Sequence, residues 1–212
     1  MNRNLVLLLA VVLTAGCIVQ SIQPFLTEDS KVAVPELTGE WTLATSFGED
    51  VAGKNIKPWT FAEDKVVTYD DNGLMAPVLV QYFRVGEVLL CQSAPGDTAD
   101  AEVNWFWAWH VVPIVTLCKV ELKADTVRFL PLNLEWLKAQ IAAGKLTLPH
   151  ISRDEKGEMP LFTATTAQWT AFLKKYASQP EAFDEKHVYV LKKKPTPSPS
   201  APSTPPPAAP PQ

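Results

Sequence analysis

Short apolar segments alternate with polar turns along most of the chain, a pattern typical of antiparallel strands. The run 65–69 is followed by Asp70-Asp71-Asn72-Gly73, and Asn-Gly accepts the positive φ angles of a tight hairpin turn. The runs 79–85 and 88–92 flank Gly86-Glu87 as a second hairpin. Further strand-like runs cover 37–43, 59–61, 114–122, 126–130 and 188–191. Strands that recur about every 8–12 residues with short turns predict an antiparallel meander curled into a barrel or a sandwich.

Two helices are predicted among these strands. Asn133 can cap a helix over 134–143, and Gly144 suits its C-terminal end. Thr165 and Gln168 have the spacing of a capping box at the start of a second helix. Four apolar residues follow with helical spacing, so that one face can be buried: Trp169, Phe172, Leu173 and Tyr176. The predicted fold class is therefore mainly β with two short helices.

The N-terminus has the three parts of a bacterial export signal. Arg3 precedes an uninterrupted apolar run over 5–13, and Thr14-Ala15-Gly16 supplies the small residues of a cleavage site. The apolar stretch 5–15 would rise about 16 Å as a helix, too short for a hydrocarbon core of about 30 Å. Cys17 follows directly, as in a lipobox, although Thr14 stands where Leu is commonest. We expect residues 1–16 to be removed and Cys17 to carry acyl chains; an ordinary signal peptide on a secreted protein is the alternative.

Composition divides the remaining chain into three parts. Residues 17–34 show no amphipathic period and are expected to form a lipidated tether, and one barrel domain is expected over 35–194. Residues 195–212 contain only Pro, Ser, Thr, Ala and a final Gln, so they cannot bury an apolar core and are expected to be a disordered tail. A net charge of −4 without a basic stripe argues against nucleic acid as a partner.

No catalytic or cofactor motif occurs in the sequence. A Gly-x-Ser-x-Gly elbow, a His-Glu-x-x-His helix and a glycine-rich phosphate loop are all missing. The histidines and cysteines lack the spacing of a zinc site, and Asp64, Asp70 and Asp71 lack that of a calcium loop. The sequence therefore predicts that the protein is not an enzyme and uses no metal or other cofactor.

An aromatic cluster and two cysteines are the candidate site residues beyond Cys17. Alternation along a strand would place Trp105, Trp107 and Trp109 on one side. There they would pack in the core, line an apolar ligand cavity or contact lipid headgroups. Cys91 and Cys118 lie in strand-like runs. If these runs pair as antiparallel neighbours, a disulfide is geometrically feasible outside the cytoplasm; the alternative is two small buried side chains.

Several segments resemble a family of uncharacterised bacterial envelope lipoproteins. They are the lipobox at Cys17 and the stretches 21–28, 35–41, 131–137 and 172–183. Gly39-Glu40-Trp41 is also similar to the Gly-x-Trp that opens the first strand of lipocalins, where the Trp plugs one end of the barrel.

These resemblances imply a lipocalin-like barrel that faces the periplasm and is held to a membrane by acyl groups on Cys17. Because Ile18 rather than Asp follows that cysteine, the outer membrane is favoured. The expected function is binding of a small apolar or amphiphilic ligand. The alternative is an envelope structural or protein-interaction module without a ligand.

Overall fold

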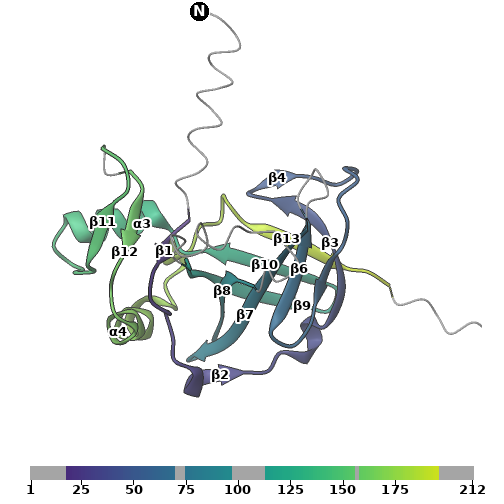
Figure 1. Ribbon diagram of the computed structural model, residues 1–212, viewed down its shortest axis with the longest axis horizontal. Helices are drawn as coiled ribbons and strands as arrows, with labels where there is room; N and C mark the ends of the chain where they lie inside the picture. Colours follow the sequence, from purple (N-terminus) through teal and green to yellow (C-terminus); the bar gives the residue numbers. More distant parts are fainter. Residues whose placement is uncertain (1–17, 70–74, 97–112, 156–157, 196–212) are drawn as a thin grey trace, which may run out of the picture.

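The computed structural model describes residues 18–69, 75–96, 113–155 and 158–195, and within them eight antiparallel strands form a closed ring (Figure 1). In ring order the strands are β3 (Gly39–Ser46), β5 (Trp59–Phe61), β6 (Lys65–Tyr69), β7 (Met75–Val85), β8 (Val88–Pro95), β9 (Thr116–Lys123), β10 (Thr126–Pro131) and β13 (Tyr189–Lys193). The last strand pairs with the first, from Val190 opposite Thr45 to Lys193 opposite Trp41. The predicted fold class, mainly β with two short helices and a lipocalin-like antiparallel barrel, is confirmed.

Four neighbouring strands, β7 to β10, are buried on both faces. Since side chains alternate along a strand, Leu89 and Cys91 on β8 point into the barrel while Leu90 between them points outward. The inward side chains belong to a core inside the barrel, and the outward ones belong to a second core on its outer wall. This double burial explains why 88–91 reads as a continuous apolar run instead of an alternating one.

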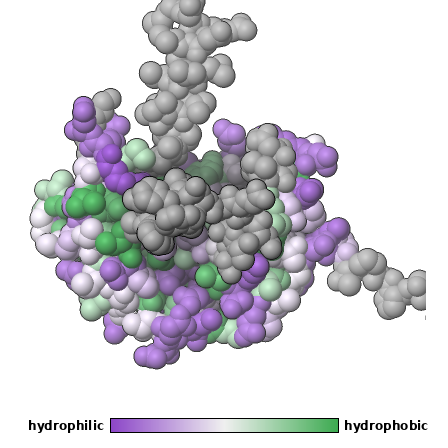
Figure 2. All heavy atoms as spheres, in the orientation of Figure 1, coloured by the Kyte–Doolittle hydropathy of each residue, from purple (hydrophilic) through white to green (hydrophobic). Residues whose placement is uncertain are grey.

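The second core is covered by an insertion between β10 and β13. It contains α3 (Leu134–Ala142), β11 (His150–Ser152), β12 (Pro160–Phe162), α4 (Thr166–Tyr176) and the 3₁₀ turn η3 (Pro180–Ala182). Figure 1 shows these elements together on one side of the barrel. The apolar stripe predicted for the second helix is buried there, because Trp169 and Leu173 are fully enclosed. Figure 2 shows apolar side chains gathered on this side, near β12, whereas hydrophilic ones predominate along the lower edge.

Both predicted helix caps are confirmed. The Asn133 side chain accepts a hydrogen bond from the Trp136 amide at 3.1 Å. Thr165 accepts one from the Gln168 amide at 3.3 Å, and Gln168 in turn accepts one from the Thr165 amide at 2.9 Å, which completes the capping box. Gly144 follows α3 with a φ of +67°, a left-handed conformation that glycine adopts without strain.

The tether predicted for 17–34 is wrong for its described part, residues 18–34. Val19 and Phe25 are buried in the second core, with exposed fractions of 1% and 0%. Ser21 exchanges two backbone hydrogen bonds with Val115, at 3.0 and 2.8 Å, and its hydroxyl accepts one from the Trp169 indole at 3.0 Å. Burial of each large apolar side chain contributes about 1.5–3 kcal/mol, so this segment is part of the folded domain.

The same segment wraps the barrel with short elements. β1 (Gln20–Ser21) adds a parallel strand to β12, and β2 (Lys31–Val32) pairs with β7. The 3₁₀ turns η1 (Glu28–Ser30) and η2 (Pro35–Leu37) lie on either side of β2, while β4 (Glu49–Asp50) extends from β3. The folded domain therefore begins by residue 18 instead of residue 35.

Trp41 closes one end of the barrel. Its side chain is fully buried, and its indole N–H donates to the Leu37 carbonyl at 2.7 Å. The Lys193 ammonium lies 5.4 Å from the centre of the Trp41 ring and donates to the Glu36 carbonyl at 2.9 Å. The plug expected from the Gly-x-Trp similarity is therefore present at this end.

Candidate functional site

The barrel encloses a cavity of about 910 Å³, which lies within the range of about 300–1,000 Å³ typical of small-molecule sites. All eight barrel strands contribute to its wall. The deep part is lined by apolar side chains that also belong to the inner core: Leu43, Phe61, Val66, Val80 and Phe129. The cavity therefore offers a mainly hydrophobic interior of suitable size for one small ligand.

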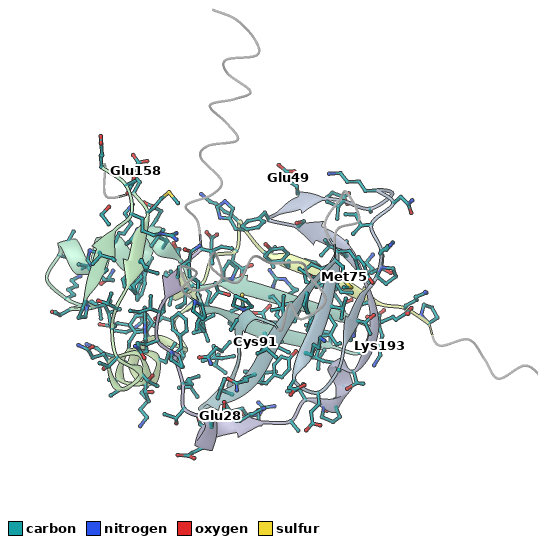
Figure 3. The ribbon with its side chains drawn as sticks, in the orientation of Figure 1. Glu28, Glu49, Met75, Cys91, Glu158 and Lys193 are labelled. Atoms are coloured by element: carbon teal, nitrogen blue, oxygen red, sulfur yellow. The ribbon has the colours of Figure 1, made fainter. Side chains whose placement is uncertain are left out.

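Strand directions place several of the residues that line this cavity at the end opposite Trp41. At that end β3 turns into β4, and Tyr69 on β6 pairs with Met75 on β7. The opposite end carries the Gly86-Glu87 turn and the buried Trp41. Figure 3 shows Glu49 at the upper end of the barrel, Glu28 at the lower end and Cys91 between them. We call the end that carries β4 and Met75 the mouth.

Aromatic residues from distant parts of the sequence meet at the mouth. The Phe47 and Tyr189 rings lie 4.9 Å apart, and the Trp59 and Tyr189 rings lie 6.1 Å apart. All three line the cavity. The sequence pattern does not single them out as site residues, because each stands alone in its segment and only barrel closure brings them together.

Phe47 has an unusual backbone conformation for an aromatic residue. Its φ is +49° and that of Gly48 is +77°, and these two residues form the turn between Ser46 and Glu49. Positive φ at both central positions is the signature of a type I′ hairpin, which normally selects Asn, Asp or Gly. The strain is maintained by the ring, which packs on Tyr189 and lies 6.2 Å from the His187 ring.

Cys91 and Cys118 lie directly opposite each other on β8 and β9, and both line the cavity. The prediction that their strands pair as antiparallel neighbours is confirmed, and in this structure both residues are thiols. Burial raises the pKa of Cys118 to about 12 and raises that of Cys91 well above its usual range. Both are therefore protonated and poorly nucleophilic at neutral pH.

The Tyr82 hydroxyl is a buried polar group beside this pair. Tyr82 faces Cys91 across β7 and β8, and burial, followed by the nearby thiol, raises its pKa. Within the described ranges no group gives this hydroxyl a hydrogen bond of standard geometry. By contrast, the Ser93 and Thr116 hydroxyls nearer the mouth pair with each other at 2.7 Å.

A carboxylate–histidine pair supports the mouth from outside. The Asp184 carboxylate lies 2.6 Å from His187 Nδ1 and accepts the Lys186 amide at 2.8 Å. Burial opposes ionisation of Asp184, but these hydrogen bonds outweigh it and lower its pKa. The pair holds His187 beside Phe47, which connects the loop before β13 to the β3–β4 turn.

The remaining predicted site residues have different outcomes. Cys17, Trp105, Trp107 and Trp109 lie outside the described residues, so their predicted roles stay predictions. In the part of the chain that the structure describes, no three His, Cys, Asp or Glu side chains gather as a metal site would require. Nor is any described helix long and apolar enough to cross a membrane.

Comparison with known proteins found no family model that matches the sequence, no matching curated protein and no matching solved structure. The resemblance to envelope lipoproteins therefore stays a prediction. The barrel itself supports the likeness to lipocalins.

Proposed function

We propose that this protein is a lipid-anchored envelope protein whose barrel binds one small apolar or amphiphilic ligand. The observation that carries the proposal is the cavity of about 910 Å³, which extends to the mouth and is lined by apolar side chains deeper in the barrel. Ligand sites of this kind combine a hydrophobic wall with a few polar groups that fix orientation. Here the polar groups at the mouth include Glu49 and Lys54, so that an amphiphile would place its chain inside and its headgroup outside.

The anchor is the second part of the proposal. The export signal and Cys17 support attachment by acyl chains, and each buried methylene contributes about 0.8 kcal/mol, so that two or three chains hold a protein durably. We place the protein at the periplasmic face of a membrane, with the outer membrane favoured because Ile18 follows the cysteine. Replacing Cys17 by Ser should release the chain into the soluble fraction; retention in membranes would contradict the anchor.

The binding proposal is tested by native mass spectrometry on the chain from Ile18 onward, exported to the periplasm and purified without detergent. We expect a reproducible extra mass that organic solvent removes. A bare polypeptide mass would contradict ligand binding and favour the alternative of an envelope protein-interaction module.

A matched pair of variants on β7 controls for effects on folding. Val78 lines the cavity, whereas its neighbour Leu79 points away from the cavity and is 45% exposed. Val78→Trp should fill part of the cavity and abolish the extra mass, while Leu79→Trp should keep it. If both variants retain the extra mass equally, the bound molecule does not lie in the barrel.

A further inference from the structure

We infer that the mouth of the barrel faces the membrane to which Cys17 is attached, so that the ligand is a lipid drawn directly from that leaflet. This inference rests on the anchor and the binding barrel proposed above. It goes beyond them because it fixes the orientation of the domain and the source of the ligand. The observation behind it is the position of Ile18, the first described residue.

Ile18 lies at the mouth. It lines the cavity and forms an isolated bridge with Asn133, which follows the mouth end of β10. Consecutive Cα atoms are about 3.8 Å apart, and the peptide bond to Ile18 joins Cys17 to a residue that lines the cavity. A lipid attached to Cys17 therefore begins at the mouth, not at the Trp41 end.

The chain after Cys17 contains no flexible linker that would let the mouth move away from the bilayer. Val19 is 1% exposed, and the backbone of Ser21 is paired on Val115. The headgroup layer on each side of a bilayer is only about 5–8 Å thick, as the difference between its total and hydrocarbon thicknesses shows. With the acyl chains in the hydrocarbon, Ile18 must lie in or next to the headgroups.

The surface at the mouth suits this position. Met75 lines the cavity edge and is 58% exposed, a large exposed fraction for an apolar side chain. Ile18 and Phe47, from two other segments, add apolar side chains at this end, where Glu49 and Lys54 supply polar groups. Apolar side chains at a membrane surface are stabilised by burial among headgroups and upper acyl chains. In this orientation a lipid chain enters the barrel from the leaflet at this end.

Depth-dependent fluorescence quenching tests the orientation on the full lipidated protein, purified from bacterial membranes. Met75→Cys and Glu87→Cys variants are labelled with an environment-sensitive maleimide dye and reconstituted in phosphatidylethanolamine–phosphatidylglycerol vesicles that carry doxyl-labelled lipid. Met75 is the first residue of β7 and Glu87 lies in the turn after it, and the 11 residues of β7 would span about 33 Å if straight. The wild-type chain treated with the dye measures background, because Cys91 and Cys118 are buried or half-buried with raised pKa values.

We expect loss of fluorescence and a blue shift for the Met75 label, and neither change for the Glu87 label. Equal quenching of both labels, stronger quenching at Glu87, or no quenching in vesicle-bound protein would overturn the orientation while leaving the ligand mass unaffected. Protein that does not float with the vesicles would contradict the anchor, and the orientation with it.

A spacer variant tests the cause of the orientation. Ten Gly/Ser residues inserted between Cys17 and Ile18 keep the anchor and the barrel but add a flexible link of about 17 Å. Quenching of the Met75 label should decrease, because the mouth is no longer held at the headgroups. Unchanged quenching would overturn the argument from anchor position, since the mouth would then bind the membrane on its own.

Discussion

The strained turn at Phe47 allows a direct test of how the mouth is built. The positive φ at this residue costs an L-amino acid with an ordinary side chain about 1–2 kcal/mol, whereas Asn tolerates the conformation by local hydrogen bonding. Replacing Phe47 by Asn removes the ring and relieves the strain. Replacing it by Ala removes the ring and keeps the strain. The difference between the two variants isolates the backbone contribution.

The expected magnitudes follow from the contacts of the ring. An aromatic pair such as Phe47 and Tyr189, at 4.9 Å, contributes about 0.5–1.5 kcal/mol beyond burial, and partial burial of the ring adds about 1 kcal/mol. Phe47→Ala should therefore lower the free energy of unfolding by about 2 kcal/mol. Phe47→Asn should lower it by about 1 kcal/mol less, because the strain is relieved.

Urea denaturation at neutral pH measures this difference as a shift in midpoint at constant slope. For a domain of this size a difference of 1 kcal/mol also shifts the melting temperature by about 2–4 °C. Equal stability of the two variants would refute the strain argument. Both variants should also retain less ligand than the wild type, because both remove an aromatic wall of the mouth.

Three further predictions address the rest of the barrel. Trp41→Ala at the closed end should lower the free energy of unfolding by about 3–5 kcal/mol, as measured by urea denaturation. Cys91 and Cys118 are directly opposed on antiparallel strands, where Cα atoms lie about 4.5–5.5 Å apart, within the range for a disulfide. We expect the exported chain to form this bond, so that its intact mass is two hydrogens lower than that of the reduced chain. The bond between Cys91 and Cys118 should add about 3–4 kcal/mol for a loop of this length, and Cys118→Ser should abolish both effects. The folded state lowers the pKa of Asp184 below its ordinary value of 3.8. The ionised carboxylate therefore contributes its full stabilisation above pH 3.8 and loses it as the pH falls through the lowered pKa. The difference in unfolding free energy between wild type and Asp184→Asn should accordingly shrink when the pH is lowered from 7 into this acidic range.

Local sequence signals predicted the barrel strands and helix caps well. The runs 59–61 and 65–69 became β5 and β6 with these boundaries, and the caps at Asn133 and Thr165 are both present. Such features depend on neighbouring residues, which periodicity and turn chemistry describe. β11 and β12 were not predicted, because they are short and lie in a segment without a clear alternation of apolar residues.

The N-terminal segment shows why local reasoning fails elsewhere. Its apolar residues have no regular period because each contacts a different partner. Ser21 binds Trp169, while the Phe25 amide donates to the Gln92 side chain at 2.7 Å. These partners lie far away in the sequence, so the local pattern of this packed segment resembles that of a tether. The same applies to the aromatic residues at the mouth, which come together only when β13 pairs with β3.

The segments that carry the resemblance to envelope lipoproteins meet mainly in the second core. The stretch 21–28 packs there through Phe25 and Leu26, and 131–137 joins 172–183 through the Asn133 amide, which donates to the Ala182 carbonyl at 2.9 Å. Together these stretches fix the N-terminal segment and the helices against the outer wall of the barrel. Most residues that line the cavity lie outside them. The segments behind the predicted resemblance therefore contribute mainly to the core on the outer wall, whereas the cavity is built from other parts of the chain.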